Sequence, residues 1–143
     1  MTPGTRTTQA PEPVGAYAYT RRIGNLLFLA GIGPRRRGSQ DIPGVTLDSA
    51  GKVSGYDIEA QVRACFANVR IVLEEAGSKW ESIVDVQVFL TDMQRDFPIY
   101  NRVWAEFFPP GPNQPTRTTI AVSALPQAGS APINFEVKVI ATV

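Results

Sequence analysis

The feature that most constrains the fold is one long amphipathic segment in the middle of the chain. Over residues 57–76, apolar side chains recur at three- and four-residue steps, which is typical of a helix that buries one face. Ser54 or Asp57 can cap its start, and Gly77 follows its end. Cys65 falls on the apolar stripe and is expected to be a buried packing residue.

The remaining segments predict a sheet for this helix to cover. Apolar and polar residues alternate over 83–90, which indicates a strand. A second helix is predicted over 97–108, with Asp96 as its cap and Pro98 in its first turn. Two helices against one sheet make a two-layer α+β sandwich. The uncovered sheet face is expected to pack on another copy, so we predict a homo-oligomer. Further strands are predicted at 16–20, 26–30, 117–123 and 133–143, with only a hint of one at 45–47.

The length of 143 residues suits a single domain over 1–143. Residues 1–13 are rich in proline and threonine and predict an irregular, mobile arm, whereas 32–55 predicts an extended loop. The net charge of +1 gives no global attraction to nucleic acid or membrane, so we expect neither as a partner. Without an apolar run of roughly 20 residues, the chain is expected to be soluble and cytoplasmic.

Two residue counts exclude whole mechanisms. The chain has no histidine, which removes Ser-His-Asp and Cys-His nucleophiles and histidine-ligated metals. Its one cysteine excludes an internal disulfide or a CxxC pair. We therefore expect no metal site built on histidine or on a thiolate cluster. Chemistry must then run on groups such as carboxylates and arginine, and arginine suits bidentate binding of a carboxylate or phosphate.

Arg117 and Glu136 are the charged residues of most interest. Arg117 opens a predicted strand, and Glu136 lies within the apolar last strand. Periodicity leaves two interpretations of each residue open. Glu136 is either an outward residue that pairs with Lys138 or a neighbouring strand, or a carboxylate buried for a purpose. Arg117 is either part of a surface salt bridge or a binding residue.

A series of short motifs resembles one known family when taken in order and spacing. The motifs are Gly15-Ala16-Tyr17, residues 24–31, residues 57–61 with Asn68-Val69, Glu75-Ala76-Gly77, residues 88–92, Tyr100-Asn101 with Phe107-Phe108, and residues 115–143. Together they resemble the reactive-intermediate deaminase family, also called the YjgF-like or Rid family, from about Gly15 to Ala141.

This resemblance implies a chorismate-mutase-like fold with one mixed sheet and a homotrimer with its sites between subunits. It also implies cofactor-free hydrolysis of enamines and imines to ketones and ammonia. By matching position, Arg117 would anchor the substrate carboxylate, and Glu136 would activate water and shuttle protons. The remaining implied substrate contacts are Tyr17, Asn101, the backbone of Gly31, and Thr119, which stands where many members have cysteine.

The extended loop resembles that of a narrower branch, the 2-aminomuconate deaminases. That likeness implies conversion of 2-aminomuconate to 4-oxalocrotonate in aromatic-compound degradation. The second carboxylate of 2-aminomuconate needs a cation to bind it. The candidates are Arg35, Arg36, Arg37, Arg21, Arg22 and Arg102. The other interpretation of residues 35–37 is a solvated basic loop. The alternatives are a broad-specificity 2-iminobutanoate/2-iminopropanoate deaminase, a non-enzymatic trimer that binds small ligands, and an RNA-cleaving member.

Overall fold

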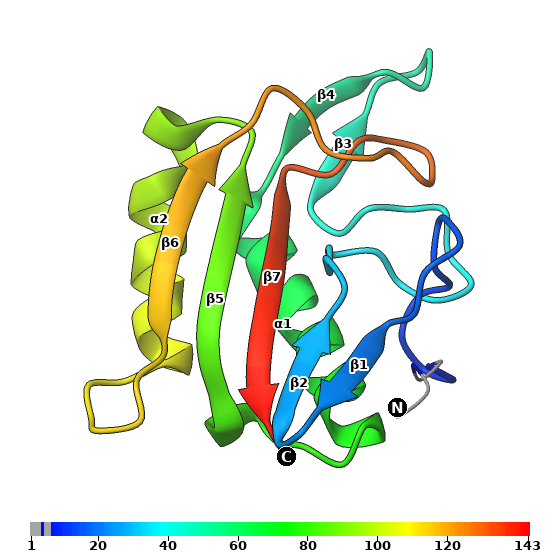
Figure 1. The fold of residues 1–143 in the computed structure, drawn as a ribbon. Coiled ribbons are helices and arrows are strands. Elements are labelled where there is room, and N and C mark those ends of the chain that lie inside the picture. The colour runs from blue at the N-terminus through cyan, green and yellow to red at the C-terminus, as the bar shows by residue number, and fades with distance from the viewer. Residues whose placement is uncertain (1–3, 5–6) are drawn as a thin grey trace.

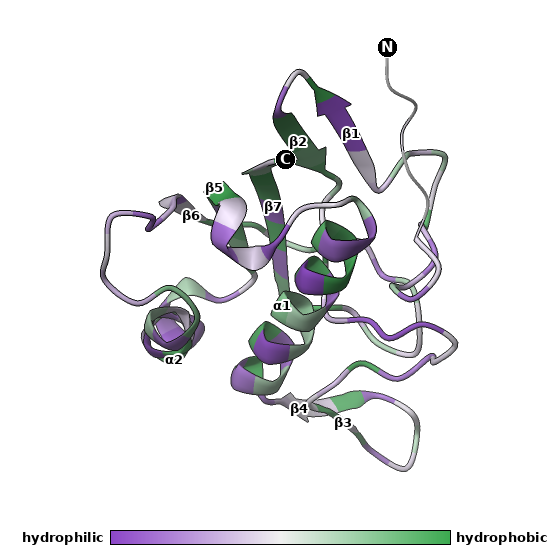
Figure 2. Cartoon of the chain, turned by 90° about the horizontal axis from the view of Figure 1, so that it is seen from below, coloured by the Kyte–Doolittle hydropathy of each residue, from purple (hydrophilic) through white to green (hydrophobic). Residues whose placement is uncertain are grey.

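The computed structural model describes Gly4 and residues 7–143. Within these residues, the main sheet has five strands in the order β1-β2-β7-β5-β6, and only β5 and β6 run parallel. Helices α1 and α2 lie on the same face of this sheet (Figures 1 and 2). The predicted α+β sandwich is confirmed. The strands are β1 (Thr20–Ile23), β2 (Leu26–Leu29), β5 (Ile83–Leu90), β6 (Thr116–Ala121) and β7 (Phe135–Thr142).

Helix α1 (Ile58–Glu75) follows its sequence prediction closely. Of the two candidate caps, Asp57 is the one used, because its carboxylate accepts the backbone N–H groups of Glu59 and Ala60. Cys65 is fully buried on the apolar stripe. No helix in the described part of the chain is long and apolar enough to cross a membrane.

Helix α2 (Met93–Phe107) begins four residues earlier than predicted. Asp92 caps it by accepting the N–H of Arg95, so the prediction of Asp96 as the cap is wrong. Asp96 is instead completely buried and accepts a hydrogen bond from the Tyr56 hydroxyl at 2.7 Å. Because Asp92 comes almost directly after β5, the helix starts there and leaves Pro98 in its interior.

The predicted strand at 16–20 is displaced in the structure. Strand β1 starts at Thr20 because the tight turn at Gly24-Asn25 pairs Ile23 with Leu26 and Thr20 with Leu29. The Ala30 N–H still donates to the Tyr19 carbonyl at 2.8 Å, and beyond Ala30 the chain leaves this hairpin, so that Ile32 pairs with Val137 of β7.

The predicted long loop contains a second small sheet. It joins β3 (Val45–Leu47), of which the sequence gives a hint, to β4 (Val53–Tyr56), which the prediction missed. The short sequence of β4 contains Gly55 and lacks clear alternation, so its period carries little signal.

The core lies between the helices and the sheet. Phe66, from the middle of α1, packs its ring against Phe135 of β7 with centroids 6.0 Å apart. It also contacts four aromatic rings from α2 and the segments beside it: Trp80, Trp104, Phe107 and Phe108. This cluster holds both helices to one face of the sheet.

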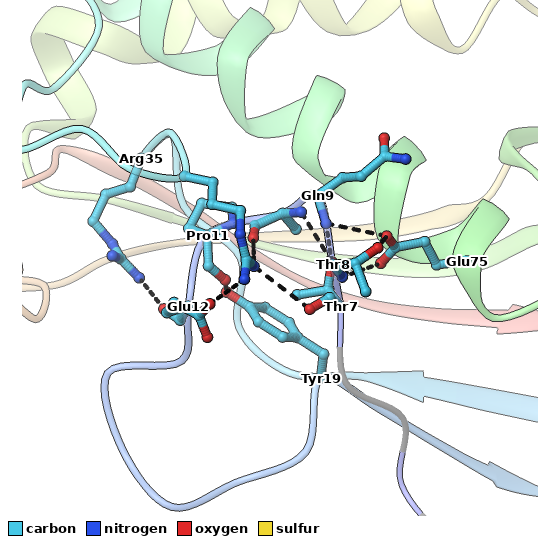
Figure 3. Close-up of polar contacts among 10 residues, drawn as sticks. Thr7, Thr8, Gln9, Pro11, Glu12, Tyr19, Arg35 and Glu75 are labelled. Atoms are coloured by element: carbon cyan, nitrogen blue, oxygen red, sulfur yellow. Dashed lines mark hydrogen bonds and ion pairs between the residues drawn. The ribbon is translucent and has the colours of Figure 1, made fainter.

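The segment expected to be a mobile arm is docked where the structure describes it. Thr8 donates its hydroxyl to the Glu75 carboxylate at 2.8 Å, at the end of α1 (Figure 3). Arg37 donates to the carbonyl of Ala10 at 2.8 Å. Ala10 is fully buried. Residues 7–13 are thus irregular, as expected, but they form part of the packed structure; residues 1–3, 5 and 6 lie outside the described residues.

Gly44 and Gly51 provide a matched test of how closely the loop before β3 packs against the start of α1. Both have a left-handed φ, +78° and +77°. A Cβ at position 44 would lie 2.6 Å from the Asp57 carbonyl oxygen, whereas a Cβ at 51 would meet nothing. We expect Gly51→Ala to cost about 1–2 kcal/mol of unfolding free energy, the conformational term alone. Gly44→Ala should cost clearly more in urea unfolding, and equal losses would contradict a tight approach of the chain at position 44.

Candidate active site

A cavity of about 550 Å³ lies beside β2 and β7, where the segments before β1 and after β2 fold over them. Glu136 and Lys138 of β7 reach it because they alternate with the buried residues of that strand and so lie on the face turned away from the helices. Other residues that line the cavity include Tyr17, Arg21, Gly31 and Arg35.

Glu136 is half-buried in this cavity. A Cβ at position 31 would lie 2.8 Å from its Oε2, so only glycine at 31 leaves room for the carboxylate where it stands. Burial raises the pKa of Glu136 above its ordinary value, and the nearby charge of Arg35 lowers it in part. The carboxylate is thereby suited to accept and return a proton.

Helix α1 positions the loop that carries Gly31 and Arg35. The Asn68 amide donates to the carbonyls of Gly33 and Arg35, at 2.9 and 2.6 Å, and the Cys65 thiol donates to the Ile32 carbonyl at 3.1 Å. Asn68 is buried, whereas a polar residue of an amphipathic helix is expected on the exposed face. Its position within the helix gave no signal of this, because its partners are backbone carbonyls of a distant loop.

Arg117 belongs to a second group of residues. In β6 it pairs with Val86, so its side chain lies on the same sheet face as the helices. Its guanidinium lies over the Trp104 and Tyr100 rings, 4.9 and 5.2 Å from their centroids, and donates to Oδ1 of Asn101 at 3.0 Å. Within the described residues, no ion pair involves Arg117.

Thr119 completes this second group from beside Arg117 on β6. Its hydroxyl and that of Tyr100 share a hydrogen bond of 2.9 Å. The predicted site residues therefore fall into two sets on opposite faces of the sheet. The cavity is lined by Tyr17, Gly31, Arg35 and Glu136, whereas Arg117 and Thr119 lie beside α2, which carries Asn101. Within one chain, the side chains of Glu136 and Arg117 therefore point to opposite sides of the sheet, and β5 lies between their strands.

Comparison with known proteins identifies the family. The family described as endoribonuclease L-PSP matches residues 7–143. The chain belongs to this family. Among its relatives, a RutC family protein of Pyrococcus abyssi is 34% identical over 85% of this chain and 84% of its own length. A 2-iminobutanoate/2-iminopropanoate deaminase of Dermatophagoides farinae is 32% identical, covering 85% of this chain and 84% of its own length.

Solved structures of known proteins share this fold over almost the whole chain. E. coli TdcF, solved with bound serine, has a TM-score of 0.80 and 26% identity, covering 99% of each chain. YyfA of Yersinia pestis, described as a Rid family protein of unknown function, has a TM-score of 0.77 and 28% identity, covering 99% of this chain and 98% of its own. The recognition of the YjgF-like or Rid family from sequence is thereby confirmed.

The three consecutive arginines, Arg35 to Arg37, contact different partners. Arg35 turns toward the cavity and donates to the Glu12 carbonyl at 3.2 Å (Figure 3), whereas Arg37 pairs with the Glu12 carboxylate. Arg36 is exposed. Of the three, only Arg35 lines the cavity in which Glu136 lies. Among the described residues, no cluster of three histidine, cysteine or acidic side chains could hold a metal ion.

The pKa of Glu136 can be tested without an activity assay. We expect its carboxyl to titrate above the ordinary glutamate value in a ¹³C NMR titration, and Arg35→Ala to raise that pKa further, because a cation that favours the ionised form is lost. Arg36→Ala is the matched control and should leave the titration unchanged. A Glu136 pKa that does not respond to Arg35→Ala would contradict the assigned electrostatics.

Proposed function

We propose that this protein is a cofactor-free hydrolytic deaminase of imines or enamines of small carboxylic acids. We further propose a cytoplasmic homotrimer whose sites each combine Arg117 of one subunit with Glu136 of the next. The observation that carries the proposal is the separation of these two residues onto opposite faces of one sheet. The deaminase of Dermatophagoides farinae among the relatives supports the reaction class.

In this mechanism Arg117 binds the carboxylate next to the reacting carbon, with its guanidinium oriented by Asn101. An enamine substrate first tautomerises to the imine. Glu136 then takes a proton from water as the oxygen adds to the imine carbon and the nitrogen is protonated. The carbinolamine collapses, Glu136 assists proton transfer to the departing nitrogen, and the products are a ketone and ammonia.

As the specific substrate we propose 2-aminomuconate, which would give 4-oxalocrotonate in aromatic-compound degradation. The charges of the cavity support a substrate with two carboxylates, because Arg21, Arg35 and Lys138 line it with Glu136 as their acidic counterpart. Arg35, Tyr17 and Thr119 remain proposed substrate contacts.

A broad-specificity deaminase of 2-iminobutanoate and 2-iminopropanoate is the alternative that the Dermatophagoides farinae relative favours. A purely binding role is less well supported, since it gives no reason for a proton-accepting Glu136 beside Gly31.

RNA cleavage, which the family description names, has weaker support in this chain. Arg37 is paired with Glu12, and Arg35 faces the cavity. Of the three consecutive arginines, only Arg36 is exposed without a role in the cavity or in an ion pair with Glu12. A single charge binds a polyphosphate weakly. We propose a small-molecule substrate and neither nucleic acid nor membrane as a partner.

Kinetics of Arg117 and Glu136 variants test the proposed roles. Loss of the charge-assisted contact in Arg117→Ala should cost roughly 2–5 kcal/mol, about 30- to 5,000-fold in kcat/KM. Arg117→Lys should recover activity only in part, because an ammonium lacks the planar fork. Glu136→Gln should lower kcat sharply with little change in KM. Arg36→Ala is the control, and near-normal turnover by folded Arg117→Ala would refute the deaminase proposal.

Mixing two inactive variants tests the site between subunits. After joint refolding of Arg117→Ala and Glu136→Gln in equal amounts, random assortment in a trimer should restore about a quarter of wild-type activity, since some sites then receive both native residues. Light scattering should give the mass of a trimer for each variant. A monomer, or mixed trimers that stay inactive, would exclude a shared site.

A further inference from the structure

Lys138 is a charged residue of the cavity that the mechanism above leaves without a role. It follows Glu136 by two positions on β7, so both side chains lie on the same face of the strand, with Cα atoms about 7 Å apart. Its ammonium donates to the Leu29 carbonyl. Within the described residues, no carboxylate lies at salt-bridge distance from it.

Arg21 extends the positive charge from Lys138 along the same face. It pairs with Phe28 of β2, which in turn pairs with Ile140 of β7, the next residue on this face after Lys138. Arg21 and Lys138 both line the cavity, with the Phe28 ring beside them. This part of the cavity thus carries positive charge beside an apolar side chain. Lys138, which belongs to it, is the next residue after Glu136 on the same face of β7.

We propose that Lys138, with Arg21 beside it, binds the second carboxylate of a dicarboxylic imine or enamine. This assignment rests on the proposed function, in which Glu136 marks the reacting carbon and Arg117 of another subunit holds the first carboxylate. An ammonium has three donors, of which Leu29 takes one. A second carboxylate would accept from the others and compensate a charge that the protein has removed from water in part.

Arg35 is less suited to this role, although it lines the same cavity. Its guanidinium donates to the Glu12 carbonyl, and its charge acts on Glu136 itself. Replacement of Arg35 should therefore change the acid–base behaviour of the site toward every substrate. Replacement of Lys138 should change only the preference between one and two carboxylates. Burial also lowers the pKa of Lys138, which a bound carboxylate would counteract.

A substrate pair that differs by one carboxylate tests the proposal. The imines of 2-oxoglutarate and 2-oxobutanoate, formed in situ when an amino-acid oxidase and O₂ oxidise glutamate and 2-aminobutanoate, serve as substrates for the wild type, Lys138→Met and Lys138→Arg. We expect Lys138→Met to lower kcat/KM for the dicarboxylate by about tenfold to a hundredfold, the loss of a charge-assisted hydrogen bond. The value of kcat/KM for the monocarboxylate should change less than about threefold, because this substrate has no second carboxylate to bind Lys138. Lys138→Arg should retain most of the preference for the dicarboxylate. Lys52→Met, at an exposed lysine of the β3–β4 turn, is the matched control.

Calorimetry with the ketoacids 2-oxoglutarate and 2-oxobutanoate measures the same preference without turnover. The wild type should bind the dicarboxylate more tightly, and Lys138→Met, or Lys138→Gln if the first variant does not fold, should abolish that difference. Equal binding of the two ketoacids by the wild type, or an equal effect of the substitution on both, would overturn the proposal. A wild type that hydrolyses neither imine but prefers the dicarboxylate would refute the deaminase function and retain the Lys138 site.

Discussion

The alternation of side chains along β7 is the constraint on which both the core and the candidate site depend. This strand lies in the middle of the sheet, between β2 and β5. Its buried residues, including Phe135, pack toward the helices, and Glu136 and Lys138 point the other way. A slip of one residue would exchange the two faces and put a carboxylate and an ammonium among aromatic rings. The desolvation of such charges costs enough to exclude that register.

The same helix that fills the core also shapes the cavity. Phe66 of α1 packs against β7, while Asn68 on the same helix holds the loop carbonyls of Gly33 and Arg35. Packing and site geometry are therefore coupled through one rigid element. This coupling explains how a loop without regular structure can keep Gly31 close to the Glu136 carboxylate.

The positions of Glu136 and Arg117 on opposite faces of the sheet bear on how copies of the chain assemble. Arg117 is held by Trp104, Tyr100 and Asn101 at the sheet edge formed by β6, and it has no carboxylate partner in the described residues. In the proposed deaminase, a ligand held by both groups lies between two copies of the chain. Oligomerisation would then be a condition of catalysis.

The sequence by itself determined the elements whose signals are local. The stripe of 57–76 predicted α1, alternation predicted Ile83–Leu90, and the order of elements predicted the sandwich, because spacing alone decides which face of an element is apolar. Short motifs also identified the family and indicated Glu136 and Arg117 as candidate site residues. The choice of Asp96 as the cap misplaced the start of α2, which Asp92 caps four residues earlier, and the weak pattern of Val53–Tyr56 hid β4.

Only the tertiary structure decided which polar groups meet. Sequence could not show that Gly31 makes room for Glu136, that Asn68 is buried under the loop, or that Lys138 shares the cavity of Glu136. It also could not separate Arg35 from Arg37, which differ only in the partners they meet. These contacts join segments far apart along the chain, and their formation depends on how whole elements pack, which no local period encodes.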